Sequence, residues 1–311
     1  MSAIEETMEK LQQGVDGVFE SKNYKQYLKT MSKFHSYSVS NCILIGLQRP
    51  DASRVAGYTA WRDKFHRQVV KGEKGIKIIA PTFGKRKQEV EKMDETGQKI
   101  LDENGNPVRE VQESEYRGFR VTTVFDISQT EGEPLPELVS ELIGPVEGFD
   151  DYMDSIKDLS PVPIRFDTME GSTAKGYYSP ARQEIVIRRG MSEEQTLKTA
   201  LHEVAHCRLG HGSEDDHEDR RTHEVQAESV AYCCCCALGL DTSDYSFGYI
   251  AGWSSGKEQK ELKASLDVIR EQADQMISGI ETKMAQIMEM RAQNETMEEQ
   301  KIQVQGIKMA M

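Results

Sequence analysis

Apolar residues recur at steps of three and four along several parts of the chain, which predicts amphipathic helices. We expect such helices at residues 3–19, 22–34 and 58–65, and again near 150–159. Beyond residue 253 a longer pattern predicts one face of an extended helix: Leu262, Leu266, Ile269, Ala273, Met276 and Ile280. Such a face packs on the body or pairs with another helix, and we favour packing.

Shorter apolar stretches bounded by glycine or proline predict strands. Residues 69–79 are typical of a strand, a glycine turn and a second strand, and residues 116–125 predict another. Three more are expected at 161–166, 176–178 and 184–187. Residues 84–115 are polar and charged and include an Asn-Gly-Asn-Pro turn signal, so we expect a loop there.

Prolines, a glycine and acids at residues 131–136 indicate a domain boundary. We therefore predict an α+β chain with a small α+β domain at 1–130, a second domain at 137–255, and a C-terminal helix and tail at 256–311. No apolar run is long enough to span a membrane, and the first residues lack the features of a secretory signal. We expect a cytoplasmic location.

The net charge of −13 argues against nucleic acid as a partner, but the charge is unevenly distributed. Residues 21–87 hold 15 lysines and arginines against three acids, a net charge of +12. Aromatic residues lie among these cations, a mixture that binds single-stranded nucleic acid through phosphates and stacked bases. The candidate DNA contacts are Lys29, Lys33, Tyr58, Trp61, Arg62, Lys71, Lys74 and Lys77. The alternative, which charge alone rates equally, is a solvated face above core aromatics.

Six cysteines are present, and four of them are consecutive, at 233–236. Neighbouring residues of a helix point in different directions, so these four cannot converge on one tetrahedral metal ion. We interpret them as small apolar side chains of a buried helix in a reducing compartment.

The segment His202-Glu203-Val204-Ala205-His206 carries the clearest chemistry in the sequence. Two histidines four residues apart lie on one helix face and can present two nitrogens to one ion. Glu203 lies beside the first histidine and could act as general base on a water that the ion activates. The alternative is a surface helix with two solvated histidines, which the apolar neighbours Leu201, Val204 and Ala205 disfavour.

A catalytic zinc site needs a third protein ligand and an open position. We assign Glu224 as that ligand; it lies in a stretch of helical pattern, residues 222–232, in which Glu224 and Glu228 share a face. Glu228 would accept the other ring N–H of a ligand histidine. The alternative third ligands are His211, His217, His223 and Glu228. The strand expected at residues 184–187 could pair with an extended substrate if it lies at a sheet edge.

The first half of the chain resembles the single-stranded-DNA-binding domain of ArdC-type antirestriction proteins. The similarity rests on residues 41–47, on Tyr58-Thr59-Ala60-Trp61, on the Lys-Gly-Glu-Lys-Gly run at 71–75 and on residues 124–130. The second half resembles the ArdC metallopeptidase domain, itself similar to the ImmA/IrrE peptidases. That similarity rests on residues 201–206 and 224–231.

The resemblance implies a mobile-element protein that binds single-stranded DNA and shields it from restriction enzymes. It also implies a zincin-like domain with gluzincin-like zinc endopeptidase activity on a protein partner, such as a repressor or restriction component. Zinc is the expected ion, with Mn2+ as the alternative, and no membrane partner is expected. The competing hypothesis is a non-catalytic DNA-protecting protein whose metal site is structural.

Overall fold

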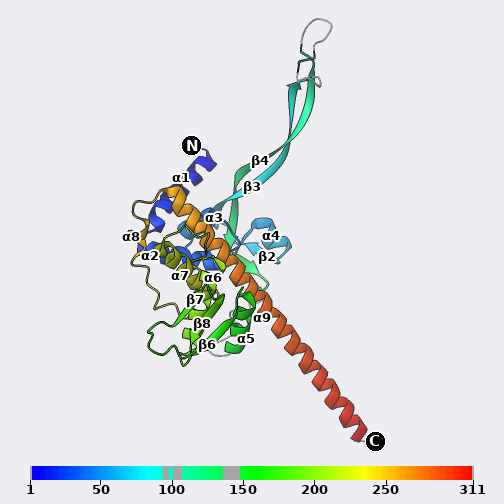
Figure 1. The fold of residues 1–311 in the computed structure, drawn as a ribbon. Helices are drawn as coiled ribbons and strands as arrows, with labels where there is room; N and C mark the ends of the chain where they lie inside the picture. Colours follow the sequence, from blue (N-terminus) through cyan, green and yellow to red (C-terminus); the bar gives the residue numbers. More distant parts are fainter. Residues whose placement is uncertain (1, 94–97, 101–106, 136–147, 310–311) are drawn as a thin grey trace.

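The computed structural model describes residues 2–93, 98–100, 107–135 and 148–309 (Figure 1). The elements, in chain order, are α1 (Ala3–Val18), α2 (Ser21–Lys33), α3 (Val39–Gln48), β1 (Val55–Gly57), α4 (Tyr58–Asp63), β2 (Arg67–Val69), β3 (Ile76–Glu91), β4 (Arg109–Asp126), η1 (Ile127–Gln129), β5 (Thr130–Gly132), α5 (Phe149–Leu159), β6 (Ile164–Asp167), β7 (Gly176–Ser179), β8 (Glu184–Arg188), α6 (Glu193–Arg208), α7 (Arg220–Ala237), α8 (Ile250–Ser254) and α9 (Gln259–Met309). The α+β class is confirmed, and the predicted helices are all present.

The first three helices form where the sequence places their caps and apolar faces. Ser2 opens α1 with a capping box, in which its hydroxyl accepts from the Glu5 amide and the Glu5 carboxylate accepts from the Ser2 amide. The apolar face of α2 is buried in full: Tyr24, Tyr27, Leu28, Met31 and Phe34. These aromatics are core residues, as the alternative to DNA stacking predicts.

The polar stretch expected to be a loop is instead the outer part of a long β-hairpin. β3 pairs antiparallel with β4 in one unbroken register from Ile76–Val124 to Glu91–Arg109. This arm projects away from the body in Figure 1. A two-stranded ribbon with solvent on both faces needs no apolar alternation, so its composition resembles that of a loop. Residues 94–97 and 101–106, which include most of the turn signal, lie outside the described residues.

The predicted strand–turn–strand at residues 69–79 contains both strands, but they belong to different sheets. β2 pairs with β5, whereas β3 joins β4 and β1 in a three-stranded sheet of order β1-β4-β3. Gly72 between them has a positive φ of 96°, a conformation that favours glycine. The turn therefore redirects the chain from one sheet to the next.

The second half builds a three-stranded sheet of order β6-β8-β7, with β8 parallel to β6 and antiparallel to β7. Residues Ile185, Val186 and Ile187 of β8 are buried, as the central position requires. Residues 184–187 are therefore an internal strand, and the condition for substrate pairing there, a position at the sheet edge, is not met. The edge strand next to α6 is β7. It lies so close to the helix that a Cβ added at Gly176 would be 2.7 Å from Thr199 Cγ2.

Helices α7 and α9 complete the core. Cys233, Cys234 and Cys235 of α7 are buried free thiols, as interpreted from the sequence. The apolar face of α9 packs on the body, and its predicted positions are all buried: Leu262, Leu266, Ile269, Ala273, Met276 and Ile280. Among the described residues, no helix combines the length and apolarity needed to cross a membrane.

The N-terminal helices and the second half share one hydrophobic core. The hydroxyls of Tyr24 on α2 and Ser229 on α7 lie 2.8 Å apart in a buried hydrogen bond. Lys25 donates to the carbonyls of Thr242 and Tyr245 at 3.0 Å each. β5 ends at Gly132, and residues 136–147, next to the predicted boundary, lie outside the described part of the chain.

Candidate metal centre and nucleic-acid surface

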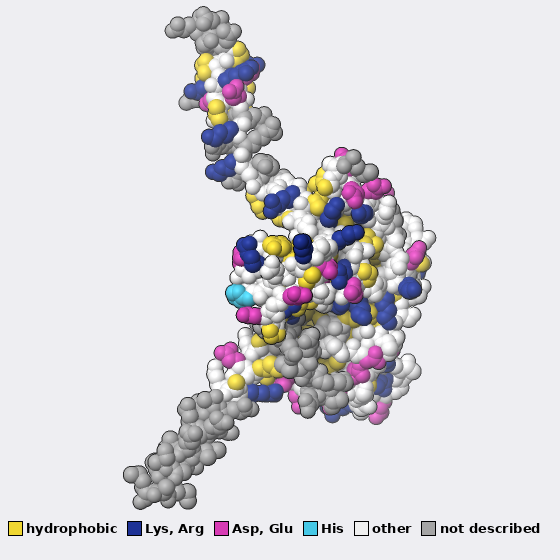
Figure 2. All heavy atoms as spheres, turned by 180° about the vertical axis from the view of Figure 1, so that it is seen from behind, with side chains coloured by type: hydrophobic (Ala, Val, Ile, Leu, Met, Phe, Trp, Pro, Cys, Tyr) yellow, Lys and Arg dark blue, Asp and Glu magenta, His cyan; other side chains and the backbone are white. Residues whose placement is uncertain are grey.

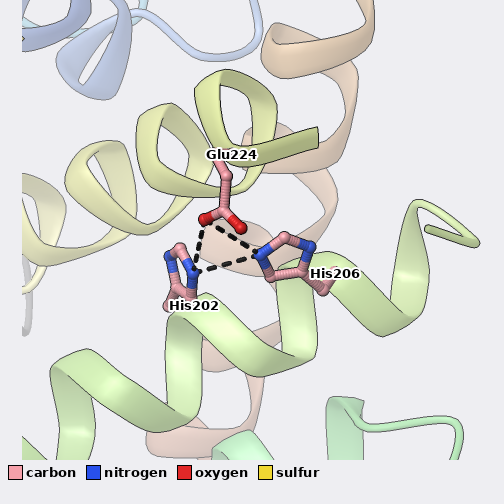
Figure 3. Close-up of side chains that lie close together, drawn as sticks. All are labelled: His202, His206 and Glu224. Carbon is pink, nitrogen blue, oxygen red and sulfur yellow. Dashed lines mark hydrogen bonds and ion pairs between the residues drawn. The ribbon is translucent and has the colours of Figure 1, made fainter. Parts of the chain in front are cut away.

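Two packed helices position the candidate metal ligands. Ser192 caps the N-terminus of α6, where its hydroxyl accepts from the Gln195 amide. Helix α7 begins at Asp219, whose carboxylate accepts from the Thr222 amide. The packing of α6 against α7 brings the first turns of α7 over the His-Glu-Val-Ala-His segment, as Figure 3 shows.

His202, His206 and Glu224 converge on one point (Figure 3), and one ligand atom of each lies within 4.8 Å of the others. The Nε2 atoms of His202 and His206 are 3.1 Å apart, and Glu224 Oε2 is 3.7 Å and 3.8 Å from them. Two ligands that each lie about 2.1 Å from a tetrahedral zinc ion are about 3.4 Å from one another. The three side chains therefore fit a zinc-sized ion.

Burial and neighbouring charges set the protonation of these groups. Burial, helped by His206, lowers the pKa of His202 to about 4, so its imidazole is neutral, the form that binds metal. The adjacent imidazole of His206 lowers the pKa of Glu224 and keeps it a carboxylate. Glu203 lies outside the ligand triad, and burial raises its pKa to about 7 despite the Tyr178 backbone amide that donates to it.

A cleft of about 400 Å3 adjoins the triad. His202 and Glu203 line it from α6, and the edge strand β7 borders it through Gly176. The other lining residues are Lys175, Gln195, Lys198, Thr199, Glu228, Asp244 and Tyr245. The cleft, the carboxyl of Glu203 and the three converging ligand atoms therefore occupy one place on the molecule.

The predicted partner of the ligand histidines is not the one found. Glu228 lines the cleft, but no hydrogen bond joins it to a histidine ring in the described part of the chain. His211 takes that place, with its Nδ1 2.8 Å from Nδ1 of His206. His223, an alternative ligand in the sequence, instead binds Asp216 through Nε2 at 2.9 Å. Sequence reasoning missed the role of His211 because a loop residue gives no periodic signal.

The candidate DNA contacts around α4 differ in accessibility. Tyr58 is 47% exposed, and its ring lies 6.4 Å from that of Phe125. Trp61 is fully buried and donates from Nε1 to the Phe125 carbonyl at 2.8 Å, so its ring cannot stack on a base. The Arg62 guanidinium is exposed but pairs with the neighbouring carboxylate of Asp63.

The candidate lysines lie on two separate elements. Lys71 and Lys74 are exposed on the loop between β2 and β3, and Lys77 is half-buried at the start of β3. Lys29 and Lys33 lie on α2, where Lys33 donates to the Ala52 carbonyl. The end of the loop packs against Phe125, the ring neighbour of Tyr58: a Cβ added at Gly75 would lie 2.2 Å from Thr123 Cγ2 and 2.9 Å from Phe125 Cζ.

The residues at the end of β4 and directly after it have a structural role. The buried side chain of Gln129 accepts from the Asp126 amide at 3.0 Å and donates to Glu73 Oε2 at 2.7 Å and to the Lys74 carbonyl at 2.9 Å. Asp126 in turn accepts from the amides of Ser53 and Ser128. Gln129 thus fixes the lysine loop to the sheet.

The arm adds aromatic surface that the sequence analysis did not find. Phe83 and Phe119 are 72% and 70% exposed, and the register places both on one face of the ribbon. Figure 2 shows lysine and arginine side chains along the arm and over the neighbouring face of the body. The shared face of the two rings follows from the pairing of β3 with β4, which no local sequence pattern gives.

Comparisons with known proteins agree with this arrangement of two halves. Residues 1–125 match the N-terminal domain of anti-restriction factor ArdC, and residues 158–278 match the IrrE N-terminal-like domain of the Peptidase_M78 family. An uncharacterized protein of Bacillus anthracis is 27% identical over 298 residues, which cover 88% of this chain and 50% of that protein. DNA primase TraC of Escherichia coli is 29% identical over 259 residues, covering 76% of this chain and 23% of TraC.

The chain thus spans half the length of the first relative and about a quarter of the second. Among solved structures, the Mn(II)-bound antirestriction protein ArdC from the R388 plasmid is 19% identical and aligns over 88% of this chain and 97% of that one, with a TM-score of 0.48. The chain combines an ArdC N-terminal domain with an IrrE-like domain of the Peptidase_M78 family.

Proposed function

We propose that this protein is an antirestriction-type protein that binds single-stranded DNA through its first half and hydrolyses a peptide bond through its second. The observation that carries the hydrolytic part is the convergence of His202, His206 and Glu224 beside a cleft that also contains Glu203. The family match over residues 158–278 supports the same reading.

The three ligand side chains would hold a divalent ion, zinc or manganese, through two imidazole nitrogens and one carboxylate oxygen. When bound, such an ion lowers the pKa of a water molecule and polarises the scissile carbonyl. Glu203 would accept the proton of that water and deliver it to the leaving amine. The free edge of β7 would hold the substrate backbone in an extended conformation above the cleft.

Replacement of Glu203 with glutamine tests this role. Glutamine keeps the size and polarity of the side chain but cannot accept the proton, so proteolysis should fall by at least about 100-fold while metal content stays at one ion per chain. A matched control is Glu193→Gln, a first-turn carboxylate of the same helix. Equal cleavage by Glu203→Gln and wild type would refute the general-base role of Glu203.

Single-stranded DNA is the partner that the first half fits best. The observation in its favour is an exposed aromatic, Tyr58, beside a loop that presents Lys71 and Lys74. The family match over residues 1–125 supports it, since the first half is an ArdC N-terminal domain. The net charge of −13 of the whole chain then matters less than the local excess of cations in residues 21–87.

A double variant, Lys71→Gln with Lys74→Gln, tests this surface. Binding of a fluorescent oligonucleotide should weaken, and the slope of log affinity against log salt should fall by about 0.7 for each lost phosphate contact. Lys260→Gln with Lys263→Gln on α9 is a control of equal charge change. An unchanged slope in the Lys71 and Lys74 variant would remove this loop from the DNA surface.

A further inference from the structure

A chain of buried side chains runs from the candidate metal centre into the protein interior. Nδ1 of His206 lies 2.8 Å from Nδ1 of His211, and Nε2 of His211 lies 2.9 Å from Oε1 of Gln226. His211 and Gln226 are 6% and 2% exposed. His206 therefore uses one ring nitrogen towards the metal centre and the other towards a fixed interior partner.

Metal binding fixes the direction of the protons along this chain. A neutral imidazole carries one N–H, so if Nε2 of His206 binds an ion, the hydrogen is on Nδ1. That hydrogen points at His211 Nδ1, which must accept it, so the hydrogen of His211 is on Nε2. There it meets the carbonyl oxygen of Gln226, and each donor in the series has an acceptor.

The opposite direction is incompatible with metal binding. A hydrogen on Nδ1 of His211 would require His206 to accept at Nδ1 and to carry its own hydrogen on Nε2. That atom lies 3.1 Å from His202 Nε2 and 3.8 Å from Glu224 Oε2, the space the ion would fill. Because the carbonyl oxygen of Gln226 faces Nε2 of His211 and can only accept a hydrogen, the network holds the tautomer of His206 that offers a lone pair to a metal.

The loop after α6 holds His211 in this position. The ring of His211 stacks on that of His223, with centroids 4.4 Å apart and an interplanar angle of 15°. His223 binds Asp216, and Asp216 accepts from the Gly212 amide at 2.6 Å. The imidazole of His211 is therefore held on one side by His223 of α7, and its own loop is held in turn by Asp216.

We propose that His211 is a positioning residue that orients His206 and fixes its tautomer for metal binding. It makes no contact with the ion or the substrate and acts through His206. This inference rests on the proposed metal site but not on proteolysis. Carboxylates and backbone carbonyls are the usual partners of ligand histidines, and their loss typically costs 10–100-fold in metal affinity.

The test compares zinc dissociation constants of purified full-length variants, measured by competition with a chromophoric chelator. His211→Phe keeps an aromatic ring for the stack on His223 but loses the acceptor, so zinc should bind at least about tenfold more weakly. His211→Asn places an amide oxygen near the same point and should restore most of that affinity. His35→Phe removes a histidine whose ring bonds to Asp274 of α9 and not to the ligand histidines, so this variant should bind zinc like the wild type.

A second readout needs no variant. Long-range 1H–15N spectra of the zinc-loaded wild type, with labelled histidine, should show the Nδ1–H tautomer for His206 and the Nε2–H tautomer for His211. The reverse tautomers, or unchanged zinc affinity in His211→Phe, would overturn the inference while leaving the metal site intact. A wild type that binds no zinc would overturn the proposed site itself.

Discussion

The side chain of Gln129 offers a sharp test of how the lysine loop is held. Gln129→Met keeps a similar volume in the core but removes every side-chain hydrogen bond. The amide of Asp126 and the carbonyl of Lys74 then lose their partners in a buried setting, while Glu73 remains partly hydrated. At about 1 kcal/mol for each of the three bonds, the free energy of unfolding should fall by about 3 kcal/mol.

Urea unfolding followed by circular dichroism measures that loss. Gln68→Met, an exposed glutamine on β2, is the matched control and should change stability by less than about 0.5 kcal/mol. Affinity for single-stranded DNA should fall in Gln129→Met and not in Gln68→Met, because only the first variant releases the loop that presents Lys71 and Lys74. A loss below about 0.5 kcal/mol in Gln129→Met would refute the reasoning, since one buried and two part-buried hydrogen bonds cannot be lost at so small a cost.

A reciprocal exchange separates the Glu73 bond from the others. Gln129→Glu alone opposes two carboxylates, whereas the double variant with Glu73→Gln restores a donor and an acceptor across the same distance. The double variant should therefore be more stable than the sum of the single effects by about 1 kcal/mol. Strict additivity would mean that the contact between residues 73 and 129 contributes nothing.

Three further outcomes follow from the site and the surface. Tyr58→Ala should weaken oligonucleotide binding by about tenfold with little change in stability, whereas Trp61→Phe should cost about 1 kcal/mol of stability and leave binding unchanged. Burial alone would raise the pKa of Asp126, but hydrogen bonds from Ser128, Ser53 and Arg54 outweigh it and lower that pKa. The carboxylate should therefore stabilise the fold above about pH 4, and this stabilisation should be lost as acid protonates it. Asp126→Asn should make the free energy of unfolding less dependent on pH in that range. Chelation should lower the melting temperature of the wild type, added zinc should restore it, and neither should affect Glu224→Ala.

The parts of the site that the sequence predicts are those set by spacing along one helix. His202 and His206 need only a helical turn between them, and the cap at Ser192 marks where that helix begins. Glu224 could be assigned because it shares a face of the next helix with Glu228, and the packing of the two helices brings it to the histidines. His211 lies in an irregular loop, so its contact with His206 depends on tertiary structure alone.

Other errors have the same physical origin. The order of strands in a sheet depends on packing, so no local pattern could tell that residues 184–187 are central and that β7 forms the edge. The arm was predicted as a loop because neither face of its ribbon is buried. Trp61 was assigned to the DNA surface because aromatic residues among cations look alike in sequence, whether they face solvent or the core.

The buried hydrogen bond between Tyr24 and Ser229 has a consequence for recombination. A recombination event between the two halves would separate Tyr24 from Ser229. It would pack α2 and α7 against foreign helices that lack the matching side chains. Chimeras joined near residue 135 should fold poorly unless the facing residues of α2 and α7 are transferred together. We therefore expect the two halves to be inherited together, although each resembles a separate domain family.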